Sequence, residues 1–159
     1  MDPTIIEIED AIIALLETAL NPLQVKVQSV PDDFVNKGRV VTCASAYVSF
    51  AGEELSRPQN AKALTCHPTN QSVVVSYDIL LSAQHLRCEK PNRGRSPGLY
   101  DLVEATRTAL GGQRISHVWG PLYVNTIKFA GVTNQFWQYM VSVSIEGNRA
   151  AMINPVLGG

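Results

Sequence analysis

Apolar side chains recur every three or four residues near the start of the chain and every second residue through much of the rest. Within residues 5–20 the helical period dominates, so we predict an amphipathic helix that an Asn-Pro pair ends. Its start is either Asp2 as cap with Pro3 as first helical residue, or a capping box of Thr4 with Glu7. The apolar stripe comprises Ile5, Ile8, Ile12, Leu15, Leu16 and Ala19.

Three β-strands are predicted in the first half of the chain. Apolar and polar residues alternate over residues 23–28, which favours a half-buried strand. Residues 39–50 are rich in Val, Tyr and Phe and end at an Ala-Gly pair, and residues 71–87 alternate over a long stretch. Residues 53–70 contain two prolines and many polar residues, which predicts a long loop of functional or mobile character.

A second helix and two further strands are predicted in the second half. Ser96 followed by Pro97 indicates a helix start, and a Gly-Gly pair indicates its end. Residues 122–130 and 136–145 have strand patterns, and residues 131–135 between them predict a hairpin turn. The apolar face of the helix comprises Leu99, Leu102, Val103, Thr106 and Leu110, and Trp137, Tyr139, Val141, Val143 and Ile145 alternate inward on the last strand.

The order of these elements, αβββαββ, predicts an α+β fold with a mostly antiparallel sheet and both helices packed on one face. Residues 1–146 form a single domain in this interpretation. Residues 147–159 show no clear periodicity and are expected to be a tail, extended or docked on a neighbouring molecule.

Composition narrows the possible partners. The 159 residues include 13 Lys and Arg against 14 Asp and Glu, a net charge of −1, whereas a dedicated nucleic-acid binder is usually strongly basic. No window reaches the roughly 20 apolar residues that a membrane span needs, and the N-terminus lacks the basic region of a secretory signal. We therefore expect a protein that is made in the cytosol and does not bind membranes.

Cysteine and histidine residues raise the question of metal binding. Cys66, His67, His85 and Cys88 could supply four ligands to Zn²⁺, but no Cys-x-x-Cys pair anchors such a site. Cys43 fits a small buried hydrophobic residue, and three scattered cysteines do not predict a disulfide framework. The sequence leaves open whether the four side chains come together, and our prediction is that the protein has no metal and no cofactor.

Motifs of catalysis are missing from the sequence. It has no Gly-x-Ser-x-Gly elbow and no glycine-rich phosphate-binding loop. We therefore expect no enzymatic activity and name no catalytic residue.

A basic segment is the most informative charge feature. Arg87, Lys90, Arg93 and Arg95 lie within nine positions that hold one acidic residue, Glu89. The segment is either a solvated surface loop or a docking surface for an acidic patch or for DNA phosphates. Repeated around a ring, such a patch would create a substantial field.

Four short segments occur in an order that resembles a known family. They are SPGLYDLVEA at 96–105, IEDAII at 8–13, the Gly-Pro-Leu step at 120–122, and the final aromatic strand. Together they resemble a family of tail proteins from Mu-like phages and prophages with contractile tails. The resemblance covers roughly residues 4–146 and departs from the family pattern in the 53–70 loop and the tail after Glu146.

That family is similar in element order to tail terminator proteins, which implies a homohexameric ring at the head-proximal end of the tail tube. Such a ring stops tube polymerisation and joins the tail to the neck connector. The implied partners are further copies of the chain, the tube protein, the sheath protein and the neck protein, with DNA passing through the lumen without specific binding. The implied location is the virion tail, and the host cytoplasm during assembly. The candidate interface residues are Arg87, Lys90, Arg93 and Arg95, with Asn154 and Pro155 in the tail segment.

Two other functions stay open from the sequence. One is another tail completion, neck or baseplate adaptor protein. The other, from a different class, is a small metal-dependent or nucleic-acid-binding protein.

Overall fold

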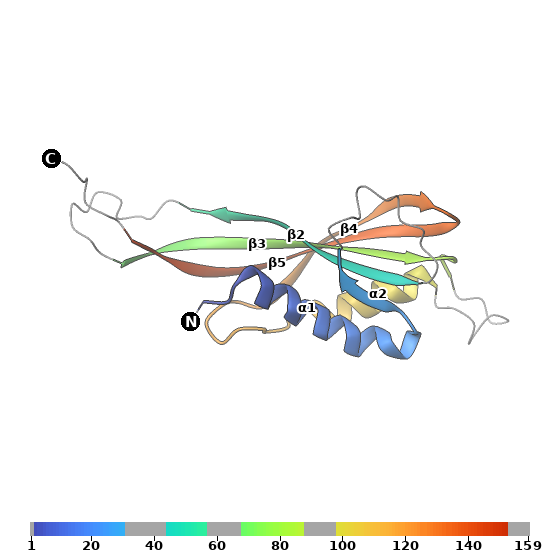
Figure 1. Ribbon diagram of the computed structural model, residues 1–159, viewed down its shortest axis with the longest axis horizontal. Helices are drawn as coiled ribbons and strands as arrows, with labels where there is room; N and C mark the ends of the chain where they lie inside the picture. Colours follow the sequence, from blue (N-terminus) through green and yellow to red (C-terminus); the bar gives the residue numbers. More distant parts are fainter. Residues whose placement is uncertain (1, 31–43, 57–67, 88–97, 153–159) are drawn as a thin grey trace.

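The computed structural model describes residues 2–30, 44–56, 68–87 and 98–152 (Figure 1). Two α-helices lie on the same side of a five-stranded sheet, which confirms the predicted α+β class and the order αβββαββ. The elements are α1 (Ile5–Leu20), a 3-10 turn η1 (Asn21–Leu23), β1 (Lys26–Ser29), β2 (Ser45–Leu55), β3 (Pro68–Ala83), α2 (Leu99–Leu110), β4 (Leu122–Thr133) and β5 (Phe136–Met152).

The strands lie in the order β1-β2-β3-β5-β4, so β3 and β5 form the centre of the sheet. All neighbouring strands are antiparallel except β1 and β2, which are parallel. A parallel pair needs a crossover connection of a dozen or more residues, and the 30–44 segment between these strands has that length. α1 packs over β1 and β2, and α2 packs over β3, β4 and β5.

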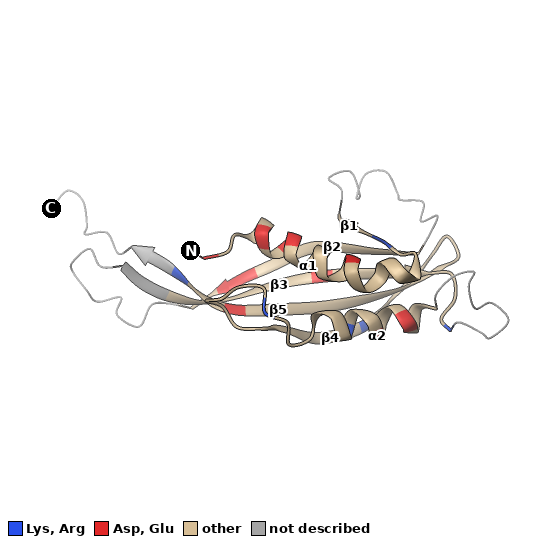
Figure 2. Cartoon of the chain, turned by 90° about the horizontal axis from the view of Figure 1, so that it is seen from below, with Lys and Arg blue, Asp and Glu red and all other residues tan. Residues whose placement is uncertain are grey.

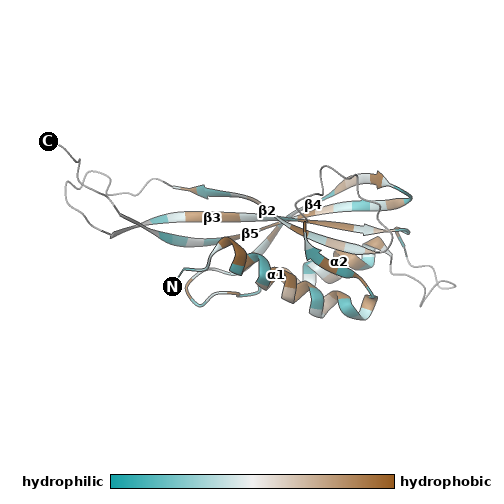
Figure 3. Ribbon diagram, in the orientation of Figure 1, coloured by the Kyte–Doolittle hydropathy of each residue, from teal (hydrophilic) through white to brown (hydrophobic). Residues whose placement is uncertain are grey.

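The core lies between the sheet and the two helices, where apolar residues gather in Figure 3. Every second residue of β3 from Val73 to Leu81 is buried on this face, as its alternation predicts. The predicted apolar face of α2 is buried along its whole length. Apolar area removed from water in this way is the main force that stabilises the fold. The buried residues of α1 are Ile8, Ile12, Leu16 and Leu20.

The start of α1 follows the second of the two predicted caps. The Thr4 hydroxyl accepts a hydrogen bond from the Glu7 backbone N–H at 3.2 Å, and the Thr4 N–H donates to Glu7 Oε2 at 2.7 Å. For α2 the predicted cap at Ser96 is wrong. Gly98 occupies the cap position, and its N–H donates to Asp101 Oδ2 at 3.3 Å, while Ser96 and Pro97 lie outside the described residues.

A buried hydroxyl joins α1 to the centre of the sheet. Tyr77 Oη donates a hydrogen bond to the carbonyl oxygen of Ile5 at 2.7 Å. Burial, and then the nearby negative charge of Glu9, raises the pKa of Tyr77, so the hydroxyl keeps the proton that it donates. This contact fixes the first turn of α1 over β3.

Several predicted strand ends are wrong. β2 continues through the Ala-Gly pair by a bulge between Phe50 and Gly52, and β3 starts at Pro68, so both ends of the predicted 53–70 loop belong to strands. β3 ends at Ala83 rather than Arg87. The predicted end of the last strand at residue 145 and the predicted tail from residue 147 are also wrong, since β5 continues to Met152. Its backbone pairs with β3 over this stretch, although the side chains show no apolar alternation.

The turn between β4 and β5 is shorter than predicted. β4 reaches Thr133 and β5 begins at Phe136, so only Asn134 and Gln135 form the loop. Both have positive φ, 50° and 67°, as a two-residue type I′ hairpin requires. This tight turn holds the two strands in fixed register at their aromatic ends.

The long central strands extend beyond the helices, and one side-chain cluster supports the base of this extension (Figure 1). Arg149 of β5 pairs with Glu53 of β2, donates to the Pro3 carbonyl at 3.2 Å and lies 5.0 Å from the Trp119 ring centroid. A Cβ on Gly147 would lie only 2.1 Å from the Trp119 ring, so the close packing of this indole requires glycine. The extension is thereby tied to the N-terminus and to the segment before β4.

Candidate assembly surface

β4 is an edge strand with an unusually accessible side. It pairs with β5 on one side, and within the described residues no strand pairs with its other side. Only its start is covered there, where Leu122 accepts from the Gly112 N–H and donates to the Gln113 carbonyl, both at 2.8 Å. An edge of this length can recruit another chain unless something blocks it.

Two irregularities and a charge oppose regular strand pairing at this edge. The register with β5 shifts between Val124 and Thr126 and again between Phe129 and Gly131. The bulged Asn125 side chain donates to Ser144 Oγ at 2.9 Å, and Lys128 is exposed between the two bulges. The side chains of β4, rather than a regular row of backbone groups, are therefore the accessible feature of this edge.

The helix-facing side of β4 is a continuous apolar row that is covered at one end and open at the other. Its register with β5 places five residues on that side: Leu122, Val124, Ile127, Phe129 and Val132. Leu122 is fully buried, whereas Phe129 and Val132 are 55% and 54% exposed. The same row therefore begins in the core of the fold and ends in solvent.

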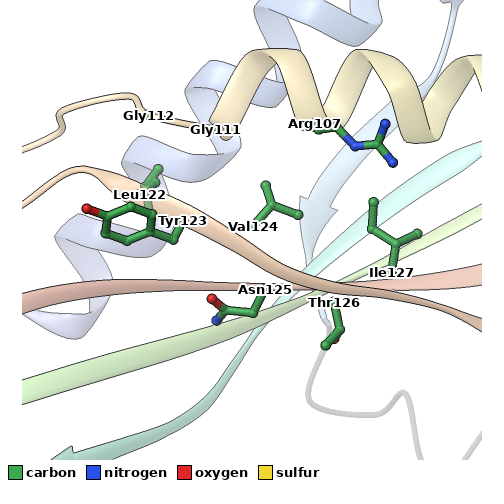
Figure 4. Close-up of a pocket in the computed structure, with 9 residues that line it drawn as sticks. All are labelled: Arg107, Gly111, Gly112, Leu122, Tyr123, Val124, Asn125, Thr126 and Ile127. Atoms are coloured by element: carbon green, nitrogen blue, oxygen red, sulfur yellow. The ribbon is translucent and has the colours of Figure 1, made fainter.

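A groove of about 500 Å³ runs between this row and the end of α2 (Figure 4). Val124 and Ile127 point from β4 towards α2, and Arg107 reaches over from the helix, while Thr126 points away. The side chains of Arg107 and Glu104 form an exposed pair at 2.9 Å. The groove thus has an apolar floor and, at its rim, Arg107 paired with Glu104.

An aromatic cluster lies further along β4 and β5, near the start of α2. Phe129 lies 5.7 Å from Tyr139 and 6.0 Å from Trp137 between ring centroids, and Tyr100 lies 6.4 Å from Tyr139. Arg87 Cζ lies 5.9 Å from the Tyr100 ring centroid. The structure therefore places Arg87, a predicted interface residue, beside exposed aromatic rings. This cluster is not evident from the sequence, because Trp137 and Tyr139 alternate like core residues.

The other predicted site residues lie mostly outside the described part of the chain. This holds for the interface candidates Lys90, Arg93, Arg95, Asn154 and Pro155, and for Cys43, Cys66, His67 and Cys88. Of the four proposed zinc ligands, His85 alone is described; its side chain is exposed and its carbonyl accepts from the Leu99 N–H at 2.7 Å. Among the described residues, no three His, Cys, Asp or Glu side chains form a metal-binding group.

α1, which lies over the other half of the sheet, is an acidic helix. α1 carries Glu7, Glu9, Asp10 and Glu17 and no basic residue, as the red segments of Figure 2 show. Glu9 accepts a hydrogen bond from the Ser29 hydroxyl of β1. Hydrogen bonds from the Thr4 backbone, and then from its side chain, hold the pKa of Glu7 below its usual value. Lys26, at the start of β1, is a basic residue near the other end of this helix.

Comparison with protein families gives a match over most of the chain. The family model described as "Gp37 protein" matches residues 12–152. No curated protein matches the chain. In the described part of the chain, no helix combines the length and apolar character of a membrane span.

Proposed function

Because the chain belongs to the Gp37 protein family, a phage-associated family, we propose that it is a structural protein of the phage tail, and specifically a tail terminator. In this proposal a homohexameric ring caps the head-proximal end of the tail tube and stops its polymerisation. The ring then joins the tail to the neck connector and meets the last ring of sheath protein. The protein acts in the host cytoplasm during assembly and stays in the virion tail.

The observation that supports this proposal most directly is the open edge at β4. Exposed apolar side chains, a groove and a partly buried aromatic cluster gather there, and a monomer would leave Phe129 and Val132 exposed to solvent. The opposite edge is a strand of four residues beside the acidic helix α1, so a contact between unlike edges can repeat from copy to copy. Heterologous contacts of this kind close into rings when the rotation between copies allows it.

The proposed role is mechanical and includes no catalytic step. A cap needs a fixed shape and several faces that bind neighbours, and the two-layer fold with two unlike edges supplies these. DNA passes through the ring without specific recognition in this proposal, in keeping with the near-neutral charge of the chain.

Tube polymerisation in vitro tests the proposal. Tube protein from the same phage is allowed to polymerise with and without this chain, and tube lengths are measured by electron microscopy. We expect shorter tubes that carry a ring at one end when the chain is present. Tubes of unchanged length without a ring would contradict the terminator role.

A deletion mutant of the phage separates this role from the other tail functions. Loss of a terminator leaves overlong or headless tails, whereas loss of a baseplate adaptor leaves no tails. Electron microscopy of lysates distinguishes the two outcomes. Missing tails would replace the terminator proposal with the baseplate alternative.

A further inference from the structure

We propose that Arg149 acts as a latch, which holds the far ends of β3 and β5 against the body of the fold. When Arg149 is released, these ends open as a unit while the rest of the fold stays intact. The strand extension is defined here as residues 68–72 of β3 and 148–152 of β5, which pair with each other. Its opening is a property of the single chain and is independent of the tail function proposed above.

The strand extension has no apolar core of its own. Among its described side chains none is buried, whereas Val73 of β3 and Ile145 of β5, just before it, are buried. β2 ends at Leu55, opposite Val73, so β3 and β5 continue beyond it as a two-stranded ribbon (Figure 1). A two-stranded ribbon is at best marginally stable in water. Contacts with the body must therefore hold the extension in place.

Arg149 makes such contacts with three separate parts of the body. Its guanidinium pairs with Glu53 of β2, donates to the Pro3 carbonyl at 3.2 Å and lies 5.0 Å from the Trp119 ring centroid. The side chains of Arg149 and Glu53 are only 24% and 18% exposed. Water and salt screen a half-buried pair of this kind less than a surface pair.

The side chain of Arg149 reaches back from the extension over the end of the core. Arg149 is opposite Gln71 of β3, whereas Glu53 is opposite Val75. The two side chains therefore meet over the stretch of β3 between these positions, where Val73 is 1% exposed. The stem of an arginine can cover apolar surface while its charged end binds polar groups. Arg149 thus joins the extension to the body at the last buried residue of β3.

Trp119 forms the other side of this contact. A Cβ on Gly147 of β5 would lie 2.1 Å from the indole, so the ring packs directly on the strand where the extension begins. The buried Nε1 of Trp119 has no hydrogen-bond partner among the described residues, so packing and the guanidinium hold the ring. Loss of Arg149 should therefore loosen the indole and the extension together.

Hydrogen bonds to the end of β2 also join the extension to the sheet. Ser56 donates its N–H and its hydroxyl to the Ser72 carbonyl at 2.9 and 3.2 Å, and Gln71 donates to the Ser56 carbonyl at 3.3 Å. The two side-chain bonds are exposed, so water competes for the same groups and their net contribution is small. The more buried contacts of Arg149 therefore decide whether the extension stays in place.

Hydrogen exchange of the full chain tests the proposal. Arg149→Met keeps an unbranched apolar side chain but removes the charge and the donors, and Glu53→Gln in the same chain avoids an unpaired carboxylate. Backbone amides of the extension should exchange about tenfold or more faster in this double variant than in the wild type. The amides of α1, α2 and the buried part of β3 should exchange at wild-type rates. Mass spectrometry of proteolytic fragments gives the rate for each segment.

Two further variants serve as controls. Arg107→Met breaks an exposed ion pair with Glu104 on α2 and should leave the exchange of the extension unchanged. Arg149→Lys keeps the charge but not the planar, multiple donors of arginine, so the extension should exchange at an intermediate rate.

The fluorescence of Trp119 provides a second measurement. The chain has two tryptophans, so Trp137→Phe leaves Trp119 as the one that emits. In this background, Arg149→Met with Glu53→Gln should shift the emission to longer wavelength while the circular dichroism spectrum stays native.

Two kinds of result would overturn the proposal. Unchanged exchange of the extension in the double variant would show that strand pairing alone holds it. Equal acceleration in the helices and the extension, or loss of the native circular dichroism spectrum, would show that Arg149 stabilises the whole fold as one unit.

Discussion

The two edge strands of the sheet differ in length and in how far the helices cover them. The β1 edge ends in a strand of four residues, with α1 packed beside it and a hydrogen bond from Ser29 to Glu9. The β4 edge ends in a strand of twelve residues, whose apolar row runs past the cover of α2 into solvent. The fold therefore packs a helix beside the short strand at one edge and leaves part of the apolar row of the long strand exposed at the other.

The contrast continues within β4 itself. Leu122 and Val132 lie on the same side of the same strand, but Leu122 is fully buried and Val132 is 54% exposed. Side-chain type does not account for this difference, because both residues are aliphatic. Only the placement of α2 and of the segment before β4 decides which part of the row serves folding and which part is available to a partner.

The largest expected effect is on folding. Leu122→Ala removes a fully buried side chain and should lower the free energy of unfolding by about 3 kcal/mol, because a cavity replaces its packing. Val132→Ala is the matched control and should change stability by less than about 1 kcal/mol. Urea denaturation measures both. Equal losses at the two positions would show that the row is covered along its whole length.

The next effect is on assembly. Phe129→Ser with Val132→Ser should lower the unfolding free energy modestly, because the contacts of Phe129 with Trp137 and Tyr139 are lost. The double variant should weaken self-association by about tenfold or more, since these half-exposed side chains lose their apolar contact area. Concentration-dependent sedimentation provides the measurement. Val118→Ser, at another exposed apolar position that does not line the groove, serves as the control. Unchanged association of the double variant would remove this end of the row from the interface.

A smaller effect is expected at the joint between α1 and the sheet. Tyr77→Phe removes the hydroxyl that donates to the Ile5 carbonyl and should cost about 1 kcal/mol of stability. Because burial raises the pKa of Tyr77, the wild-type protein should also lose stability as the pH rises above the ordinary tyrosine value, about 10. The Phe variant should lose less over that range. Parallel alkaline profiles for the two proteins would contradict this role of the hydroxyl.

The smallest effect concerns the cap of α1. The lowered pKa of Glu7 means that its ionised form stabilises the folded state at neutral pH, and that this contribution is lost as the pH falls through the lowered pKa. Glu7→Gln can still accept the hydrogen bond from the Thr4 N–H but does not titrate. Between neutral and acidic pH, the melting temperature of the wild type should therefore fall slightly more than that of the Glu7→Gln variant. Identical pH profiles would show that this charge contributes nothing.

Sequence patterns predicted the parts of the fold whose burial follows a regular period. The alternation of β3 and the apolar stripe of α2 are both strong, and the structure buries the same residues. Element order and the two-layer arrangement followed from these patterns. The ends of β2, β3 and β5 did not, because backbone pairing continues where the side chains carry no alternation.

The assembly surface was harder to predict for a different reason. Trp137 and Tyr139 have the alternation of core residues, and they do face the helix side of the sheet. Both side chains are only partly buried, because α2 does not completely cover the N-terminal end of β5. Arg87 was a candidate from its charged neighbours, but its contact with Tyr100 depends on tertiary structure.

The native mass of the wild-type protein as a function of concentration tests the central claim most directly. If two unlike edges join head to tail and close, the mass should reach that of a hexamer and then stay constant as the concentration rises. A mass that remains that of the single chain at every concentration, with tube protein present, would contradict the account. A mass that keeps growing without a limit would contradict closure of the ring.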